Sequence, residues 1–160
     1  MQLAVRKATQ KDIKDIQLLN LKLFKKEHKQ YDSTLNLEWT FGIHGTKYFK
    51  QRINSNNSLV LIASINKTIV GYLIANIRKV PPYRNINNIA EIENMFVEKR
   101  YRGNGIGRKM VEEFFAWAKS KGVKFTTVTA FAKNKLALKF YQKLGFIKRE
   151  ITMEKNITQN

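Results

Sequence analysis

The 160-residue chain contains no cysteine. Disulfide bonds, thiolate metal sites and a cysteine nucleophile are therefore excluded. The two histidines, His28 and His44, lack further ligands at metal-binding spacing, so we expect no metal site. The chain also lacks an apolar run long enough to span a bilayer, and its first residues lack the apolar stretch of a signal peptide. We expect a cytoplasmic protein with no membrane partner.

Acidic residues are also scarce. The chain has 12 Asp and Glu residues against 30 Lys and Arg residues, which gives a net charge of +18 at pH 7. Such a charge attracts polyanions, nucleic acids among them. The lysines are scattered from Lys7 to Lys155 without a long basic block, and arginine, the better reader of phosphates and bases, is the minority cation. This pattern argues against a nucleic-acid partner, and part of the charge can attract a smaller polyanionic ligand.

Length and composition predict a single domain over residues 1–160, because an apolar fraction of 43% supplies a full core. Apolar, β-prone runs predict strands at 3–8, 58–63, 68–77, 92–97 and 125–131. Asn66 and Lys67 form a predicted hairpin turn, so the second, third and fourth strands are antiparallel neighbours. Gly71 inside the third strand predicts a bulge or a close approach of another backbone.

Helical spacing of apolar residues predicts a helix capped by Thr9 with Asp12 near the capping-box position, and a short helix around Tyr48. Two more helices are predicted, one at 108–121 and one in the segment 134–146 that is ended by Gly145. The segment 27–45 is rich in large apolar residues, but turn residues interrupt any single element there. The fold class is therefore mixed α/β, of the α+β type.

The stretch from Glu91 to Gly107 combines a strand, a basic glycine-rich turn and the start of a helix. Such a junction leaves backbone N–H groups free, and the helix dipole adds partial positive charge, so the turn suits a phosphate group. The string required for a P-loop is absent, and the glycines do not follow the dinucleotide fingerprint. The remaining pattern is Arg102-x-x-Gly105-x-Gly107 directly after a strand.

This pattern resembles the acyl-CoA pyrophosphate loop of the GNAT superfamily of N-acyltransferases, although that family often has proline where Lys99 stands. A second motif of the family, Asn-x-x-Ala-x-x-x-Tyr-x-x-x-Gly-Phe, matches about 30 residues further on. Its matching positions are Asn134, Ala137, Tyr141, Gly145 and Phe146. The resemblance covers residues 91–146 and implies the GNAT fold, a central and mostly antiparallel sheet that is splayed at the fourth strand and flanked by helices.

The resemblance implies acetyl-CoA as co-substrate and direct transfer of its acetyl group to a primary amine, with no metal. A backbone N–H near Met95 would polarise the thioester carbonyl. Asn134 would bond the pantetheine arm or set the start of its helix, and Lys143 would reach the 3′-phosphate or remain solvated. The full set of implied cofactor-binding residues is Met95, Phe96, Val97, Arg102, Gly103, Asn104, Gly105, Ile106, Gly107, Arg108, Asn134, Ala137, Tyr141 and Lys143.

Catalytic roles follow from the chemistry of the step. An alkylammonium has a pKa of about 10.4, so freeing its lone pair at pH 7 costs about 4–5 kcal/mol and calls for a base. Glu91 and Glu93 lie two apart on one strand and point to the same face. The resemblance implies a glutamate base on this strand. Glu93 is the first choice and Glu91 the second, and a solvent-facing carboxylate is the alternative for either. The resemblance also implies Tyr141 as the acid that protonates the leaving thiolate.

The acceptor stays open among three hypotheses: a small-molecule amine, a protein N-terminus or lysine, or no acceptor at all in a non-catalytic module that binds CoA or nucleic acid. The positive surface disfavours polycationic acceptors unless the pocket is locally acidic. Exposed strand edges allow a homodimer. The acids that could make the pocket acidic are Glu27, Asp32, Glu38, Glu91 and Glu93.

Overall fold

The computed structural model describes residues 2–158. Its centre is a five-stranded sheet in the order β1-β2-β3-β4-β5, in which the first four strands are antiparallel and β5 runs parallel to β4. The predicted mixed, mostly antiparallel sheet is thereby confirmed. The strands are β1 Leu3–Lys7, β2 Ser58–Ile65, β3 Thr68–Lys79, β4 Asn88–Val97 and β5 Thr126–Val128.

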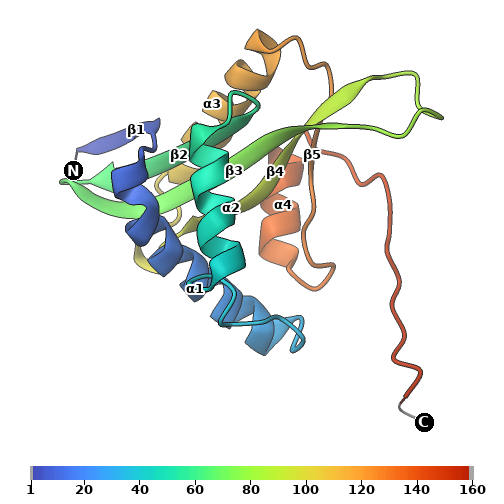
Figure 1. Ribbon diagram of the computed structural model, residues 1–160, viewed down its shortest axis with the longest axis horizontal. Coiled ribbons are helices and arrows are strands. Elements are labelled where there is room, and N and C mark those ends of the chain that lie inside the picture. Colours follow the sequence, from blue (N-terminus) through green and yellow to red (C-terminus); the bar gives the residue numbers. More distant parts are fainter. Residues whose placement is uncertain (1, 159–160) are drawn as a thin grey trace.

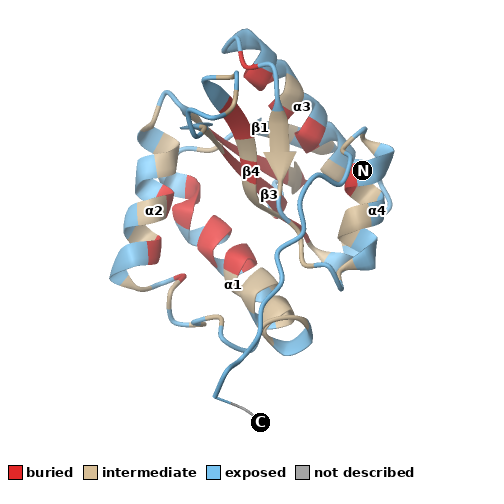
Figure 2. Cartoon of the chain, turned by 90° about the vertical axis from the view of Figure 1, so that its right-hand side faces the viewer, coloured by how far each residue is buried: buried red, intermediate tan, exposed pale blue. Residues whose placement is uncertain are grey.

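Helices cover both faces of the sheet, α1 and α2 on one side and α3 and α4 on the other (Figures 1 and 2). Short 3-10 helices precede α1 (Gln10–Asp12) and α3 (Lys99–Tyr101). Within the described chain, 2–158, no helix has the length and apolarity needed to cross a bilayer. The helices are α1 Ile13–Gln30, α2 Ile43–Asn54, α3 Ile106–Ser120 and α4 Lys135–Lys143.

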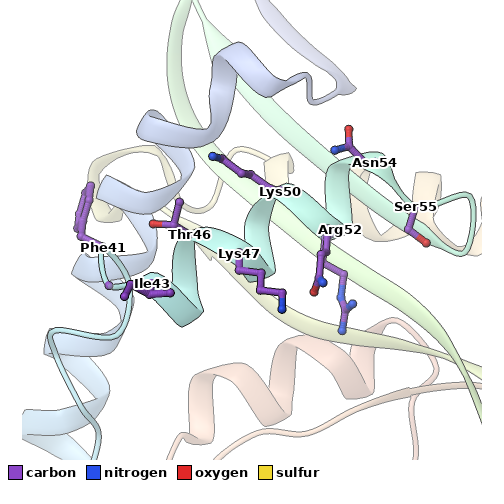
Figure 3. Close-up of a pocket in the computed structure, with 10 residues that line it drawn as sticks. Phe41, Ile43, Thr46, Lys47, Lys50, Arg52, Asn54 and Ser55 are labelled. Atoms are coloured by element: carbon purple, nitrogen blue, oxygen red, sulfur yellow. The ribbon is translucent and has the colours of Figure 1, made fainter.

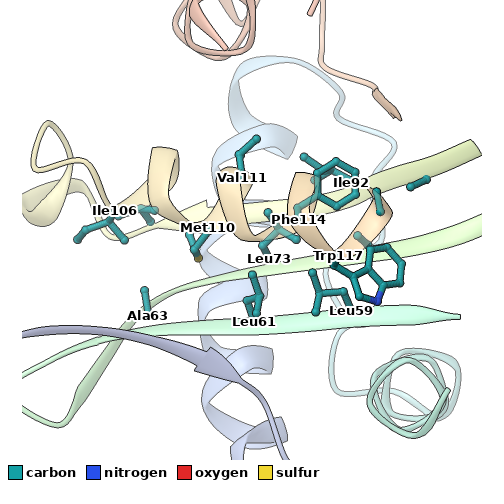
Figure 4. Close-up of a cluster of buried hydrophobic side chains, with 14 of the residues drawn as sticks. Leu59, Leu61, Ala63, Leu73, Ile92, Ile106, Met110, Val111, Phe114 and Trp117 are labelled. Carbon is teal, nitrogen blue, oxygen red and sulfur yellow. The ribbon is translucent and has the colours of Figure 1, made fainter. Parts of the chain in front are cut away.

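Alternation along β2 divides the core into two parts. Leu59 and Leu61 point toward α3, where they meet Phe114 and Trp117 (Figure 4), whereas Val60 and Ile62 point toward α1 and α2. The apolar residues that alternate along β2 thus pack against the apolar residues that recur at helical spacing along α3. The apolar face predicted for α3 is the face that packs on the sheet.

The β2–β3 hairpin follows the sequence prediction. Asn66 and Lys67 have φ values of 48° and 69°, and two consecutive positive φ angles are what a tight hairpin turn requires. The predicted irregularity at Gly71 is present in both forms. The β2–β3 register shifts beside it, and a Cβ atom at Gly71 would lie 3.0 Å from the carbonyl oxygen of Phe96.

Several predicted boundaries were wrong. The fifth strand is only Thr126–Val128 rather than 125–131. The last helix ends as predicted, since Gly145 follows its C-cap Leu144 with a φ of 92°. α1 continues to Gln30, and α2 begins at Ile43, so Gly45 lies inside a helix instead of breaking one. Glycine is required at position 45, because a Cβ atom there would lie only 2.1 Å from the Trp39 carbonyl oxygen. Close tertiary packing, which local propensity does not register, decides this position.

Candidate active site

The sheet opens between β4 and β5. Only three residue pairs join the two strands, the last being Ile92 with Val128, while β4 continues to Val97. The predicted splay is therefore present, but it begins at Ile92 rather than near Met95. Beyond that point the β5-facing edge of β4 has no neighbouring strand within residues 2–158. A chain-like ligand can lie along this edge and bond to its backbone.

The glycine-rich turn stands directly beyond the open end of β4. Gly103 and Gly105 have φ values of 80° and 76°, and a Cβ atom at either would meet nothing within 4 Å. Glycine is therefore needed there for its left-handed backbone, not for lack of space. Gly105 is the N-cap of α3, which begins at Ile106, two residues before the predicted start.

The backbone amides of this turn are unengaged. Across the described residues, no N–H group from Gly103 to Arg108 donates a hydrogen bond to another part of the chain. These groups include the first amides of α3, where the helix dipole contributes partial positive charge. The arrangement is therefore suited to a phosphate group.

α4 packs against this turn through Gly107. A Cβ atom on Gly107 would lie 3.1 Å from the ring of Phe140 and 3.9 Å from the side chain of Met95. The absence of a side chain thus lets the start of α3, helix α4 and strand β4 meet at one place. As a result, the two motifs that lie far apart in the sequence become adjacent in space.

The basic side chains of the loop have partners of their own. The Arg102 Nε atom donates to the Val97 carbonyl oxygen at 2.7 Å, and its guanidinium lies 5.3 Å from the Phe96 ring centroid. Arg108 is exposed and pairs loosely with Glu112 at 3.6 Å. Lys143 is exposed. Arg102 therefore binds the end of β4, and its contact with a phosphate stays a prediction.

α4 brings two predicted residues to the splay. The Asn134 side chain caps the helix by accepting a hydrogen bond from the Ala137 N–H at 3.1 Å. Tyr141 is 9% exposed, and its hydroxyl donates no hydrogen bond within residues 2–158. Burial, with a smaller contribution from the Glu27 carboxylate, raises the pKa of Tyr141. Its hydroxyl therefore stays protonated at neutral pH, as an acid must.

The predicted base Glu93 is held by residues of α2. Arg52 donates to both of its oxygens at 2.7 Å, and the Tyr48 hydroxyl donates to one of them at 2.6 Å. The β3–β4 register passes from Asn94 to Ile92 with no partner for Glu93, so Glu93 is a bulge residue. The bulge lets Glu93 and the following Asn94 both reach Tyr48.

Hydrogen bonding fixes the orientation of Asn94. Because Tyr48 donates its only hydroxyl proton to Glu93, its oxygen must accept, and the Asn94 amide N–H does donate to it at 3.0 Å. The Oδ1 atom of Asn94 is then left buried without a hydrogen-bond partner. Glu91, the second predicted base, pairs with Arg78 at 2.8 Å near the sheet surface. The structure thus places an arginine on each predicted base.

Sequence reasoning did not assign Tyr48 or Arg52 to this site. They are four residues apart on one helix, so they share a face, but nothing in that spacing indicates which strand the face covers. Burial and the neighbouring Glu93 charge raise the pKa of Tyr48, and the same carboxylate raises the pKa of Arg52. Both side chains are therefore held in their proton-bearing forms.

A hollow lies beside α2 and shares Arg52 with the Glu93 network (Figure 3). Lys47, Lys50 and Arg52 make its lining basic, and no carboxylate contributes to it. None of the predicted catalytic residues Glu91, Glu93 and Tyr141 lines this hollow.

Comparisons with known proteins point to one family. The model of the Acetyltransferase (GNAT) family matches residues 21–146. An uncharacterized N-acetyltransferase of Methanocaldococcus jannaschii is 27% identical over 153 residues, covering 92% of this chain and 62% of that protein. A glucosamine 6-phosphate N-acetyltransferase of Arabidopsis thaliana is 33% identical over 72 residues, covering 45% of this chain and 46% of that protein. The chain thus spans less than two thirds of the length of these relatives.

A solved structure has the same fold. The crystal structure of a predicted acetyltransferase from Clostridium acetobutylicum with acetyl-CoA superposes with a TM-score of 0.79 at 24% identity, covering 99% of each chain. The family match includes the strand, the glycine-rich turn and α4, which are the parts that form the splayed site. The predicted resemblance is confirmed, and the chain belongs to the Acetyltransferase (GNAT) family.

Proposed function

We propose that this chain transfers the acetyl group of acetyl-CoA to a primary amine by direct attack of the amine on the thioester. One observation carries the proposal: the unengaged amides of residues 103–108 stand at the open end of the β4–β5 splay. Membership of the family and the acetyl-CoA in the Clostridium acetobutylicum structure support it.

In this proposal the diphosphate of CoA is bound by the amides from Gly103 to Arg108, with Asn104 and Ile106 among them. The pantetheine arm runs along the open edge of β4, beside Met95, Phe96 and Val97, and passes Asn134 and Ala137 at the start of α4. Arg108 and Lys143 are exposed, and in this proposal both contact the phosphates. The net charge of +18 favours the approach of such a polyanion.

The reaction needs three proton transfers. A carboxylate takes one proton from the ammonium group of the acceptor, and the lone pair so freed attacks the thioester carbon. A C–N bond forms and the C–S bond breaks. The electron pair of the C–S bond goes to sulfur, which takes the Tyr141 proton. The protonated amide then returns a proton to the Tyr141 oxygen, so the tyrosine is restored. A backbone N–H beyond the bulge can stabilise the oxyanion.

The sequence predicts Glu93, and then Glu91, as the carboxylate that takes the first proton. That assignment stays a prediction. Both oxygens of Glu93 already accept hydrogen bonds from Arg52 and Tyr48, which favours a role in orienting the site. A base must itself reach the proton that it removes. Glu93→Gln tests whether Glu93 is itself the base. If it is, the variant should lose the acidic limb of the pH–rate profile.

A small-molecule amine is the proposed acceptor, and a protein N-terminus or lysine is the alternative. Support comes from the Arabidopsis thaliana relative, which is named for the small amine glucosamine 6-phosphate. A third candidate is a non-catalytic module that binds CoA or nucleic acid.

The decisive experiment measures thiol release from acetyl-CoA with a panel of small amines and of peptides bearing a free N-terminus or lysine. Mass spectrometry identifies the acetylated product, and Gly105→Glu serves as the variant that cannot bind the diphosphate. Turnover of small amines by the unmodified protein supports the proposal, and turnover of peptides alone supports the protein acceptor. Absence of CoA binding, together with a DNA affinity that falls steeply with salt, would overturn both.

A further inference from the structure

The hollow beside α2 extends along that helix from Phe41 to Ser55 and has a volume of about 930 Å³. Three of the side chains that line it are basic, and no Asp or Glu lines it. A ligand in this hollow therefore meets positive charge that no carboxylate in the lining offsets. The hollow favours an anionic group over a cationic one.

Arg52 is a fixed cation in the lining of this hollow. Its Nε and Nη2 atoms donate to the two Glu93 oxygens, each at 2.7 Å, and its guanidinium lies 4.9 Å from the Tyr48 ring centroid. Its third nitrogen, Nη1, donates no hydrogen bond within residues 2–158. The Arg52 side chain is 24% exposed, so the guanidinium is held in place but still accessible. A guanidinium that is already oriented loses little further entropy when it binds an anion.

Lys47 provides a second cation beside Arg52. In Figure 3 the side chains of Lys47 and Arg52 extend to the same side of α2, whereas that of Lys50 extends to the other side. In the part of the chain that the structure describes, the Lys47 ammonium forms neither an ion pair nor a hydrogen bond. The two side chains thus offer open, charged donors, which are the groups that bind phosphate and carboxylate oxygens.

The guanidinium of Arg52 also connects the hollow to the splay. Glu93, to which Arg52 donates, is the bulge residue of β4. Beyond Ile92 the β5-facing edge of β4 has no neighbouring strand within residues 2–158. A group bound at Arg52 is therefore one side chain away from the strand along which the pantetheine arm is proposed to run.

We propose that Lys47 and Arg52 bind a phosphate or a carboxylate on the acceptor, so that the acetylated substrate is a primary amine that also carries an anionic group. This inference rests on the proposed function and narrows its acceptor to one chemical class. The anion accepts hydrogen bonds from the Arg52 Nη1 atom and the Lys47 ammonium, and the amino group at the other end of the molecule reaches the splay. Arg52 then has two roles, because it orients Glu93 and also contacts the substrate.

The charge of the hollow argues against a polycationic acceptor. Every additional ammonium group on such an acceptor would meet Lys47, Lys50 and Arg52 without a carboxylate in the lining to receive it. The net charge of +18 attracts anions to the whole surface, but at about 0.15 M salt this attraction is screened beyond about 8 Å. Binding at Lys47 and Arg52 can therefore be separated from general attraction by single substitutions.

The test is a binding titration that needs no turnover. The anionic probes are n-butyl phosphate and pentanoate, and 1-pentanol and n-butylammonium are the neutral and cationic analogues. Each is titrated into the protein without CoA at about 0.15 M salt and followed by NMR shifts of the Lys47 side-chain CH₂ groups and the Arg52 Nε–H. We expect saturable shifts with an anion and none with the other two probes. Lys47→Gln should weaken the affinity for that anion about tenfold, because a charge-assisted hydrogen bond is lost.

Matched variants separate a specific site from the effect of net charge. Lys50→Gln makes the same change of charge on a side chain of the same hollow that extends the other way, and Lys14→Gln makes it on an exposed position of α1. Both should leave the affinity within about twofold of the parent value. Lys47→Arg keeps the charge and should preserve binding. Because Lys47 is exposed, Lys47→Gln should unfold at the same temperature as the parent protein.

Turnover provides a second readout once an active amine is found. Primary amines of equal chain length, 4-aminobutyl phosphate and 4-aminobutanoate, should have a lower KM than 4-aminobutanol or 1,4-diaminobutane, and Lys47→Gln should raise KM for the anionic amines alone. Equal anion affinity of the parent protein and Lys47→Gln would overturn the inference, as would an equal loss in Lys50→Gln or tighter binding of n-butylammonium. The proposed function fails by a different result, namely no binding of CoA to the parent protein, and the titration without CoA is read independently of it.

Discussion

Replacing Asp12 by asparagine tests how the first helix is anchored. Arg6 of β1 donates two hydrogen bonds to the Asp12 carboxylate, each of 2.9 Å, and the Thr9 backbone N–H donates a third at 2.7 Å. Asp12 is 6% exposed. The Arg6 hydrogen bonds, together with those from Thr9, lower the pKa of Asp12 from 3.8 to about 2. The carboxylate therefore joins β1 to the start of α1.

The magnitude follows from linkage between protonation and folding. One pH unit of difference between the folded and unfolded pKa is worth about 1.4 kcal/mol, so the lowered pKa stabilises the fold by about 2 kcal/mol at neutral pH. Because the folded pKa is the lower one, this contribution is complete above the unfolded value of 3.8 and is lost as the pH falls toward 2. Asp12→Asn should lack this contribution at every pH, whereas the parent protein should lose it only at low pH.

Urea unfolding followed by circular dichroism measures the difference. We expect Asp12→Asn to unfold with a free energy about 2 kcal/mol lower than the parent protein at pH 7, and the gap should narrow between pH 4 and pH 2. Asp15→Asn, an exposed position on the same helix, is the control and should change little. A gap that does not vary with pH, or no gap at pH 7, would refute the reasoning from charge.

Three further predictions concern the active site. Gly105→Glu should weaken CoA binding at least a hundredfold by calorimetry, because a side chain at φ 76° strains the turn and its charge repels phosphate; unchanged affinity would contradict the loop assignment. Tyr141→Phe should lower kcat about a hundredfold or more while leaving the Kd for CoA within about twofold, and parental rates would remove the acid role. Arg52→Gln should lower kcat more than it weakens CoA binding, because Glu93 and Tyr48 lose their anchor; equal effects would indicate general destabilisation. The control for Arg52→Gln is Lys50→Gln, a change on the same helix at a residue that does not bond to Glu93 or Tyr48.

Much of the fold was predictable because local signals and tertiary packing agree. The hairpin at Asn66 and Lys67, the bulge and close approach at Gly71, and the apolar face of α3 all follow from short patterns with a direct physical cause. The segment 27–45 was not predictable in the same way. Phe24 of α1 stacks on Trp39, and Gly45 in the first turn of α2 lies close to the Trp39 carbonyl oxygen. No local period reveals either contact.

The candidate site divides along the same line. The amino-acid sequence alone determined the family, the glycine-rich turn and the presence of Tyr141 on a later helix, because these reside in contiguous motifs whose spacing is itself the constraint. Tertiary structure alone decided that Arg52 and Tyr48 bond to Glu93, and that the Asn94 Oδ1 atom is buried without a hydrogen-bond partner. Those relations join residues from different helices and strands. They arise from the bulge in β4 and the packing of α2 against it, and chain order does not encode such distances.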